Sequence, residues 1–166
     1  MSIQSTKRRI LGFAAASVVA LAAAFGTASA APAPIEAMKT ITASFDANSD
    51  GIVTAAEHHD FTSTAFVSMD ADADQRIDET EFLEWDMGFA YIAEGLGRSD
   101  TYSQVKRDIF AGWDADGDGA VSLSEANAWA AAEFINADAD ADGAVVARDL
   151  ATGSASFAAM LSAVRS

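Results

Sequence analysis

The chain contains no cysteine among its 166 residues, and it has few basic residues. Without cysteine, disulfide bonds and thiolate metal sites are excluded. Lysine and arginine number 10 against 25 aspartates and glutamates, which gives a net charge of −15 at pH 7. So acidic a chain is repelled by nucleic acid and by anionic membrane surfaces, and we expect neither as a partner.

The first 30 residues have the three parts of an export signal. Three basic residues at positions 7–9 precede an apolar stretch over residues 10–25, and a small-residue cleavage site follows at 28–30. We therefore expect residues 1–30 to be a cleaved signal peptide and the mature protein to be periplasmic or secreted; an uncleaved membrane anchor is the alternative. The mature chain keeps seven basic residues, so its net charge is −18. Having no disulfides, it needs another source of stability, and bound metal ions are one.

Four acidic segments of 12 residues share one pattern, and 17 of the 25 acidic residues lie in them. Each has oxygen-bearing side chains at positions 1, 3 and 5, an apolar residue at position 8 and a carboxylate at position 12. This is the spacing of the EF-hand loop, which surrounds a hard cation such as Ca²⁺ with oxygen ligands. Acidic turns that are merely solvated would not repeat four times in this register. The loops are 46–57 (DANSDGIVTAAE), 70–81 (DADADQRIDETE), 114–125 (DADGDGAVSLSE) and 138–149 (DADADGAVVARD).

Loops 1 and 3 match the pattern most completely. Each has a glycine at position 6 for the sharp turn and a glutamate at position 12 for bidentate binding. In loop 1 the expected ligands are Asp46, Asn48, Asp50, the Ile52 carbonyl, Thr54 through a water molecule, and Glu57. In loop 3 they are Asp114, Asp116, Asp118, the Ala120 carbonyl, Ser122 and Glu125.

Loops 2 and 4 depart from the pattern in different ways. Loop 2 has Gln75 at the turn, where a left-handed backbone costs about 1 kcal/mol, but its many carboxylates favour trivalent ions. Loop 4 has Val146 at position 9 and the shorter Asp149 at position 12, so we expect weak binding or a smaller ion such as Mg²⁺. The expected ligands of loop 2 are Asp70, Asp72, Asp74, the Arg76 carbonyl, Asp78 and Glu81. Those of loop 4 are Asp138, Asp140, Asp142, the Ala144 carbonyl and Asp149.

The spacing of the loops predicts an all-α fold of four EF-hand helix–loop–helix units over residues 45–166. Residues 31–44 form an N-terminal lead-in, which we expect to be flexible over residues 31–40. Loops 1 and 2 are separated by 12 residues, and so are loops 3 and 4. One such short helix, about 18 Å long, cannot turn the chain back. Loops 1 and 2 must lie at its opposite ends, so we predict that loop 2 pairs with loop 3 and loop 1 with loop 4.

Apolar side chains at helical spacing predict the remaining helices. Residues 82–96 carry five of them and predict one helix after loop 2. A glycine-containing break follows at residues 95–100, in which Ser99 or Asp100 is expected to be the N-cap of the next helix. A short terminal helix is expected after Gly153.

The four-loop pattern resembles the EF-hand superfamily. The export signal, the short interloop segments and the absence of cysteine make the chain similar to the lanmodulin family of exported bacterial lanthanide binders. The similarity is closest from Phe134 onward, in FINADADADGAVVARDLATGSASFAAML. The resemblance implies helix–loop–helix units, binding of calcium or lanthanides, and the same pairing of loops 1 with 4 and 2 with 3. The departures are alanine in place of proline at position 2 of every loop, aspartate at position 9 in loop 2 alone, and a longer segment between loops 2 and 3.

Three functions follow as hypotheses. The leading one is an exported calcium-binding protein, a buffer or a sensor that folds on metal binding. The second is a lanthanide-binding protein, which the carboxylate-rich loop 2 favours. The third is an interaction module that metal makes rigid, with Trp85, Phe89 and Tyr91 as a surface for an unidentified protein target.

Catalysis is not expected. The sequence offers no nucleophile beside a base and no glycine-rich phosphate loop, and the loop carboxylates are accounted for as metal ligands. We expect the aromatic side chains to pack in the core. His58 and His59 are expected to be exposed helix residues rather than transition-metal ligands.

Overall fold

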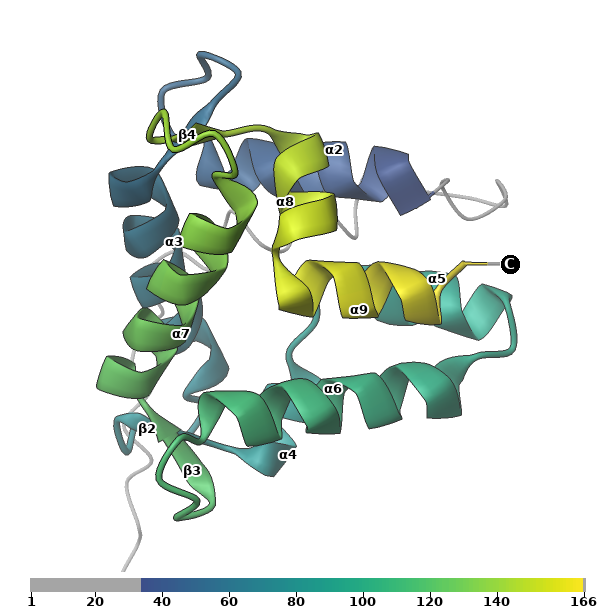
Figure 1. The fold of residues 1–166 in the computed structure, drawn as a ribbon. Coiled ribbons are helices and arrows are strands. Elements are labelled where there is room, and N and C mark those ends of the chain that lie inside the picture. Colours follow the sequence, from purple (N-terminus) through teal and green to yellow (C-terminus); the bar gives the residue numbers. More distant parts are fainter. Residues whose placement is uncertain (1–33, 166) are drawn as a thin grey trace, which may run out of the picture.

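The computed structural model describes residues 34–165 (Figure 1), so the signal-peptide prediction for residues 1–30 lies outside the described residues. The described residues form eight helices and two small antiparallel sheets, which confirms the mainly helical fold class. None of these helices is long and apolar enough to cross a membrane. In chain order the elements are α2 (Pro34–Phe45), β1 (Val53–Thr54), α3 (Ala55–Met69), β2 (Arg76–Asp78), α4 (Glu79–Glu84), α5 (Phe89–Gly95), α6 (Ser99–Trp113), β3 (Ala120–Ser122), α7 (Leu123–Ala137), β4 (Ala144–Val145), α8 (Ala147–Gly153) and α9 (Ala155–Ala163).

Two pairs of short strands join the four loops. Strand β1 of loop 1 pairs with β4 of loop 4, with Val53 opposite Val145. Strand β2 of loop 2 pairs with β3 of loop 3, with Ile77 opposite Val121. The two strand pairs lie at opposite ends of α3 and α7, which run side by side (Figure 1). The predicted pairing of loop 1 with loop 4 and of loop 2 with loop 3 is confirmed.

The helices α3 and α7 begin inside the preceding loops. Thr54 and Ser122, at position 9, accept a hydrogen bond from the N–H of the position-12 glutamate, whose carboxylate accepts one from the N–H of the cap residue. This reciprocal capping box satisfies two N–H groups that have no partner within the helix. Each helix therefore has 15 residues rather than the predicted 12, because the last three loop positions form its first turn.

The N-terminal segment is helical. Since α2 begins at Pro34, the expectation of a flexible lead-in is wrong from residue 34 onward. Met38, Ile41 and Phe45 are buried on one face of α2, which packs against α8 and α3. Their spacing of three and four residues is a helical signal that the interpretation of the sequence overlooked.

The predicted single helix over residues 82–96 is wrong, because α4 and α5 are separated by residues 85–88. Gly88 has a φ of +100°, a left-handed conformation that glycine adopts readily. The Asp86 carboxylate accepts a hydrogen bond from the Gly88 N–H and stabilises this turn.

The predicted first residues and N-caps of α6 and α9 agree with the structure in part. Helix α6 begins at Ser99 with Arg98 as its N-cap and without a side-chain cap, so neither Ser99 nor Asp100 caps it. Helix α9 follows Gly153, as predicted, and Ser154 caps it by accepting a hydrogen bond from the N–H three residues on.

One hydrophobic core connects both pairs of loops. Phe45 of α2 stacks on Phe61 of α3 with ring centroids 3.8 Å apart, and meets Phe157 of α9 edge-on at 6.0 Å. Toward loops 2 and 3, Phe82 packs edge-on against Trp113 at 5.3 Å. The core packing predicted for the aromatic side chains is confirmed at these positions.

His58 is buried, which corrects the expectation that both histidines are exposed. Its side chain is 5% exposed, and its ring stacks on Phe45 with centroids 5.2 Å apart. Burial lowers the pKa of His58 to about 4, because the charged imidazolium would lose its hydration. His59 is exposed, as predicted.

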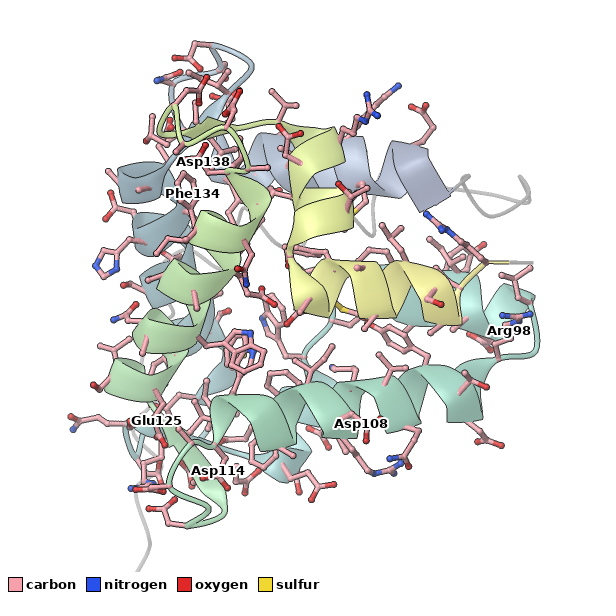
Figure 2. All side chains as sticks on the ribbon, in the orientation of Figure 1. Arg98, Asp108, Asp114, Glu125, Phe134 and Asp138 are labelled. Carbon is pink, nitrogen blue, oxygen red and sulfur yellow. The ribbon has the colours of Figure 1, made fainter. Side chains whose placement is uncertain are left out.

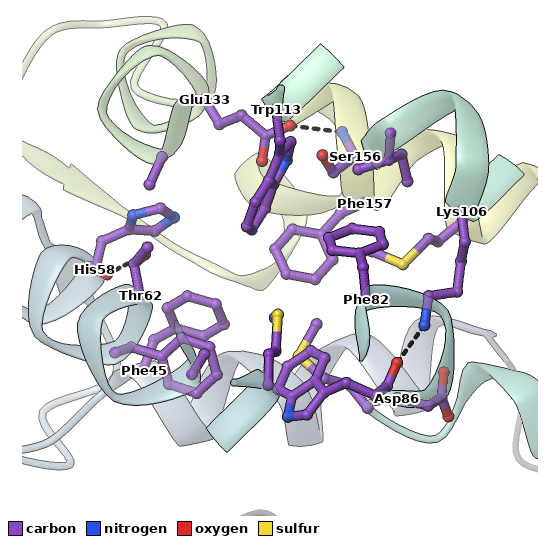
Figure 3. Close-up of a pocket in the computed structure, with 18 of the residues that line it drawn as sticks. Phe45, His58, Thr62, Phe82, Asp86, Lys106, Trp113, Glu133, Ser156 and Phe157 are labelled. Atoms are coloured by element: carbon purple, nitrogen blue, oxygen red, sulfur yellow. Dashed lines mark hydrogen bonds between the residues drawn. The ribbon is translucent and has the colours of Figure 1, made fainter. Parts of the chain in front are cut away.

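A cavity of about 80 Å³ lies within the core, and ionisable side chains reach its wall (Figure 3). Glu133 accepts hydrogen bonds from Ser154 Oγ at 2.9 Å and from the Ser156 N–H at 2.6 Å. Lys106 donates to the Leu83 carbonyl at 2.9 Å, and burial lowers the pKa of Lys106 to about 8. Both groups therefore have partners within the protein, and they connect α7 to α9 and α6 to the end of α4.

Replacing His58 with phenylalanine should reduce the pH dependence of stability. The pKa of His58 is about 4 in the folded protein against 6.5 in the unfolded chain, so the unfolded chain takes up the proton first as the pH falls. Stability is therefore lost between pH 6.5 and pH 4, by at most about 3 kcal/mol. Urea unfolding at pH 7 and pH 5 should differ less for His58→Phe than for the wild type. The exposed control, His59→Gln, should behave as the wild type does, and equal pH dependences in all three would contradict this account.

Gly153 has no room for a side chain. A methyl group there would lie 2.5 Å from Ala137 Cα and 2.8 Å from the Asn136 carbonyl oxygen. Because backbone atoms cannot rotate away, Gly153→Ala should lower the free energy of unfolding by about 1–3 kcal/mol. A methyl at Gly112 would meet the end of the Trp129 ring at 2.7 Å, and a side chain can move. Urea unfolding should therefore show a smaller loss for Gly112→Ala, and the reverse order would refute this packing argument.

Candidate metal centres

The aspartate at position 1 organises each loop. Its two oxygens accept hydrogen bonds from the N–H groups of positions 5 and 6, so the loop turns around this carboxylate. The two N···O distances are 3.1 and 2.8 Å at Asp46, 3.0 and 2.9 Å at Asp70, 3.1 and 2.9 Å at Asp114, and 3.1 and 3.0 Å at Asp138. Figure 2 places Asp114 near one end of α7 and Asp138 at the other.

The side chains at positions 3 and 5 close two further turns. The position-5 aspartate accepts a hydrogen bond from the N–H of position 7 in every loop, at 2.8–3.1 Å. In loops 1 to 3, the position-3 side chain accepts one from the N–H of position 5, at 2.8–3.1 Å. These bonds turn the predicted ligand oxygens toward the inside of the loop.

In each of loops 1, 2 and 3, the glutamate at position 12 accepts hydrogen bonds from both the start and the end of its own loop. In loop 1, Glu57 Oε1 lies 3.2 Å from the Ala47 N–H nitrogen and 3.4 Å from that of Asn48. Glu57 Oε2 accepts from the Thr54 N–H at 2.9 Å. Loops 2 and 3 contain the same set of bonds. One carboxylate therefore ties the start of the loop to the start of the next helix.

These hydrogen bonds favour the ionised glutamate. The Thr54 N–H and hydroxyl groups lower the pKa of Glu57. The equivalent groups of Ser122 lower the pKa of Glu125 to about 2. Both carboxylates are thus charged at neutral pH, which is the form that binds a cation.

In loop 4 the carboxylate at position 12 has a shorter reach. Asp149 accepts a hydrogen bond from the Val146 N–H at 3.0 Å. Within residues 34–165 it accepts none from positions 2 and 3, and the Ala139 N–H donates instead to the Ala137 carbonyl at 2.9 Å. Loop 4 is therefore closed by fewer bonds than the other three, as the missing methylene group of aspartate predicts.

Positions 4 and 6 of the loops have left-handed backbone. At position 6 the φ angles are +92° at Gly51, +71° at Gln75, +92° at Gly119 and +86° at Gly143. At position 4 they are +59° at Ser49, +62° at Ala73, +71° at Gly117 and +59° at Ala141. The conformation of Gln75 was expected, but that of position 4 was not, although the glycine in loop 3 signals it. Each residue with a Cβ in this region costs about 1–2 kcal/mol, so the loop bonds described above must offset local strain.

Carboxylates converge in loops 2, 3 and 4. In each of these loops, three carboxylate oxygens from different residues lie within 4.8 Å of one another. The groups are Asp70, Asp72 and Glu81; Asp114, Asp116 and Asp118; and Asp138, Asp140 and Asp142. Loop 1 has an asparagine at position 3, so an amide oxygen takes that place. Converging oxygens of this kind fit a hard cation such as Ca²⁺.

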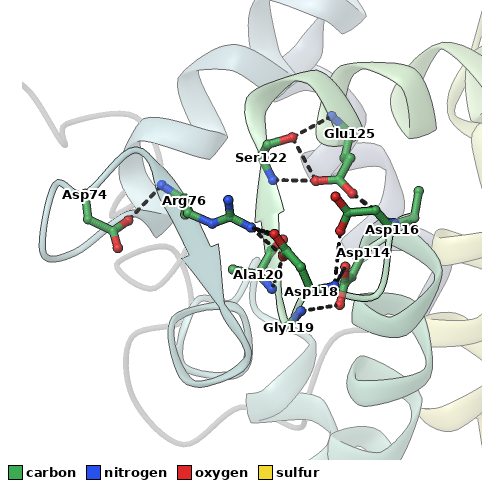
Figure 4. Close-up of polar contacts among 10 residues, drawn as sticks. Asp74, Arg76, Asp114, Asp116, Asp118, Gly119, Ala120, Ser122 and Glu125 are labelled. Atoms are coloured by element: carbon green, nitrogen blue, oxygen red, sulfur yellow. Dashed lines mark hydrogen bonds and ion pairs between the residues drawn. The ribbon is translucent and has the colours of Figure 1, made fainter.

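Arg76 connects loop 2 to loop 3 (Figure 4). Its Nη2 lies 2.6 Å from Asp118 Oδ2, also contacts Asp118 Oδ1, and donates to the Ala120 carbonyl at 3.0 Å. The hydrogen bond that Arg76 donates to the Asp118 carboxylate raises the pKa of Arg76. The sequence had pointed only to the carbonyl of Arg76, because the contact of its side chain depends on the pairing of β2 with β3.

Changing Asp149 to glutamate should strengthen metal binding by loop 4, because the longer side chain can reach positions 2 and 3 and bind bidentately. We expect the dissociation constant for Ca²⁺ at loop 4 to fall about tenfold, equivalent to about 1.4 kcal/mol. A calcium titration followed at the Gly143 amide by NMR measures this site. The converse variant, Glu125→Asp, should weaken loop 3 by a similar factor at the Gly119 amide. An unchanged loop 4 in a well-folded Asp149→Glu variant would count against side-chain reach as the cause.

Neither a scan against protein-family models nor a search of the curated proteins finds a match for this chain. Its function is therefore inferred from the fold and from the geometry of the four loops.

Proposed function

We propose that this protein is an exported, calcium-binding EF-hand protein with four helix–loop–helix units, which acts as a buffer or as a sensor that folds on metal binding. The observation that carries the proposal is the convergence of three carboxylates within 4.8 Å in each of three loops. The common hydrogen-bonded scaffold of all four loops supports it. So does their joining in pairs through buried apolar residues at position 8, since paired loops can bind ions cooperatively.

In this proposal each loop holds one ion through its own oxygens. A bound ion supplies positive charge where 17 acidic side chains repel one another. The side chains at positions 1, 3 and 5, the carbonyl at position 7 and the carboxylate at position 12 would hold it. In loops 1 to 3 the position-12 glutamate also belongs to the capping box of the next helix. A shift of this side chain toward the ion therefore acts on the start of that helix.

A lanthanide is the second candidate ion, and loop 2 is the reason. Asp70, Asp72 and Glu81 converge there, and Asp74 and Asp78 bring the number of carboxylates among the expected ligands to five. A trivalent ion gains more than a divalent ion from each carboxylate, because the Coulomb energy scales with the charge. Loop 4, with its shorter Asp149, is the candidate for Mg²⁺.

The third hypothesis, a docking surface made by three aromatic residues, is not retained. Phe89 is completely buried. Trp85 is half-buried, and its Nε1 donates to Ser68 Oγ at 2.9 Å. Tyr91 is 49% exposed, so the three side chains do not share one exposed surface. No enzymatic role is proposed.

Metal titrations of residues 31–166 test the proposal. Far-UV circular dichroism should show helix gained as Ca²⁺ reaches roughly micromolar free concentration, the range of EF-hand sensors. A variant with all four position-12 carboxylates changed to amides should not respond, because it lacks the bidentate ligand. If La³⁺ acts at submicromolar concentration while Ca²⁺ needs about millimolar, the lanthanide is the physiological ion. The absence of any response to either ion would refute the proposal.

A sensor exposes apolar surface when it binds metal, whereas a buffer does not. Binding of a dye specific for exposed apolar surface should rise with Ca²⁺ in a sensor and stay constant in a buffer.

A further inference from the structure

A positively charged side chain of loop 2, the guanidinium of Arg76, already contacts the candidate ligands of loop 3. The Arg76 bridge, meaning the contacts of Arg76 Nη2 with both Asp118 carboxylate oxygens and with the Ala120 carbonyl, engages positions 5 and 7 of loop 3 (Figure 4). The side chain of position 5 and the carbonyl of position 7 are both expected ligands of a metal ion. The guanidinium thus supplies, at part of the candidate metal centre, the positive charge that a metal ion would supply.

The pairing of the strands explains how Arg76 reaches the other loop. Arg76 lies opposite Ser122 in the β2–β3 ladder, and its own N–H is fixed by Asp74 Oδ1 at 2.8 Å. Its side chain extends along β3 toward Ala120. In the other pair of loops, position 7 is occupied by Ile52 and Ala144, which have no charge. The bridge is therefore specific to one of the two loop pairs.

We propose that Arg76 sets the metal affinity and selectivity of loop 3, as an intramolecular cation that competes with the metal ion for Asp118 and Ala120. This proposal rests on the proposed metal binding by loop 3. An ion that enters loop 3 has to displace the guanidinium and then remains near its charge. Loop 3 therefore fills after loop 1, although the two loops match the ligand pattern equally well.

The same charge acts on selectivity. The repulsion between Arg76 and a bound ion is proportional to the charge of the ion, so a trivalent ion is disfavoured more than a divalent one. Arg76 and Asp118 are 41% and 45% exposed, so water screens the interaction and the effect is moderate. At loop 3 the bridge consequently favours Ca²⁺ over a lanthanide.

The variant Arg76→Gln removes this charge. The control variant, Arg107→Gln, removes the same charge from α6, where Arg107 Nε lies 3.4 Å from Glu79 Oε1 and contacts no expected ligand. Arg76→Lys keeps the charge but loses the planar fork. Each variant of residues 31–166 is titrated with Ca²⁺ and, separately, with La³⁺. NMR follows the amides of Gly119 for loop 3 and Gly51 for loop 1, and circular dichroism checks that the variants fold alike.

In Arg76→Gln we expect the dissociation constant at loop 3 to fall roughly tenfold for Ca²⁺ and roughly thirtyfold for La³⁺, as a unit charge a few ångströms away in water implies. Loop 1 should be unchanged. Arg107→Gln should differ from the wild type by less than about threefold, the size of a screened surface charge, and Arg76→Lys should stay close to the wild type.

Two outcomes separate this proposal from the one on which it rests. If loop 1 binds metal but loop 3 has equal affinities in the wild type and Arg76→Gln, Arg76 does not compete and the proposal is wrong. An equal gain in Arg107→Gln would also overturn it, because general charge would then be the cause. If no loop binds either ion in any variant, the proposed function itself fails.

Discussion

Hydrogen bonds from backbone N–H groups to carboxylates hold the four loops in shape. In every loop the position-1 aspartate accepts hydrogen bonds from positions 5 and 6, and in three loops the position-12 glutamate accepts them from positions 2, 3 and 9. Bonds of this kind, with one charged partner, are stronger than neutral ones. They keep closely spaced negative charges in place and offset the left-handed strain of positions 4 and 6. The proposed metal ions would bind these same oxygens, so binding would act directly on the fold.

The helix starts and the strand pairs depend on those loops. The glutamate that closes loop 1 also belongs to the capping box of α3, and that of loop 3 to the capping box of α7. Since α3 runs from loop 1 to loop 2 and α7 from loop 3 to loop 4, each helix connects the two strand pairs. The apolar residues at position 8 are completely buried and join the same core that α2 and α9 complete. The four loops are therefore connected to one another by two helices and one shared core.

The two loop pairs differ in charge. The β2–β3 pair contains the Arg76 bridge, whereas the β1–β4 pair has apolar residues at the equivalent positions. Loop 4 differs again, because Asp149 does not reach the start of its loop. Four loops of one length thus give four distinct candidate metal sites, and the differences come from single side chains on a common backbone.

The sequence by itself determined the four loops, their expected ligands and their pairing, because ligand spacing and the length of a helix are local properties. It also contained the helical signal of α2, which was overlooked, and the short reach of Asp149. Only the tertiary structure decided the burial of His58, which depends on Phe45 from another helix. It alone decided the Arg76 bridge, which joins residues 42 positions apart. Such contacts require the core and the strand register to be in place, and no local pattern in the chain encodes them.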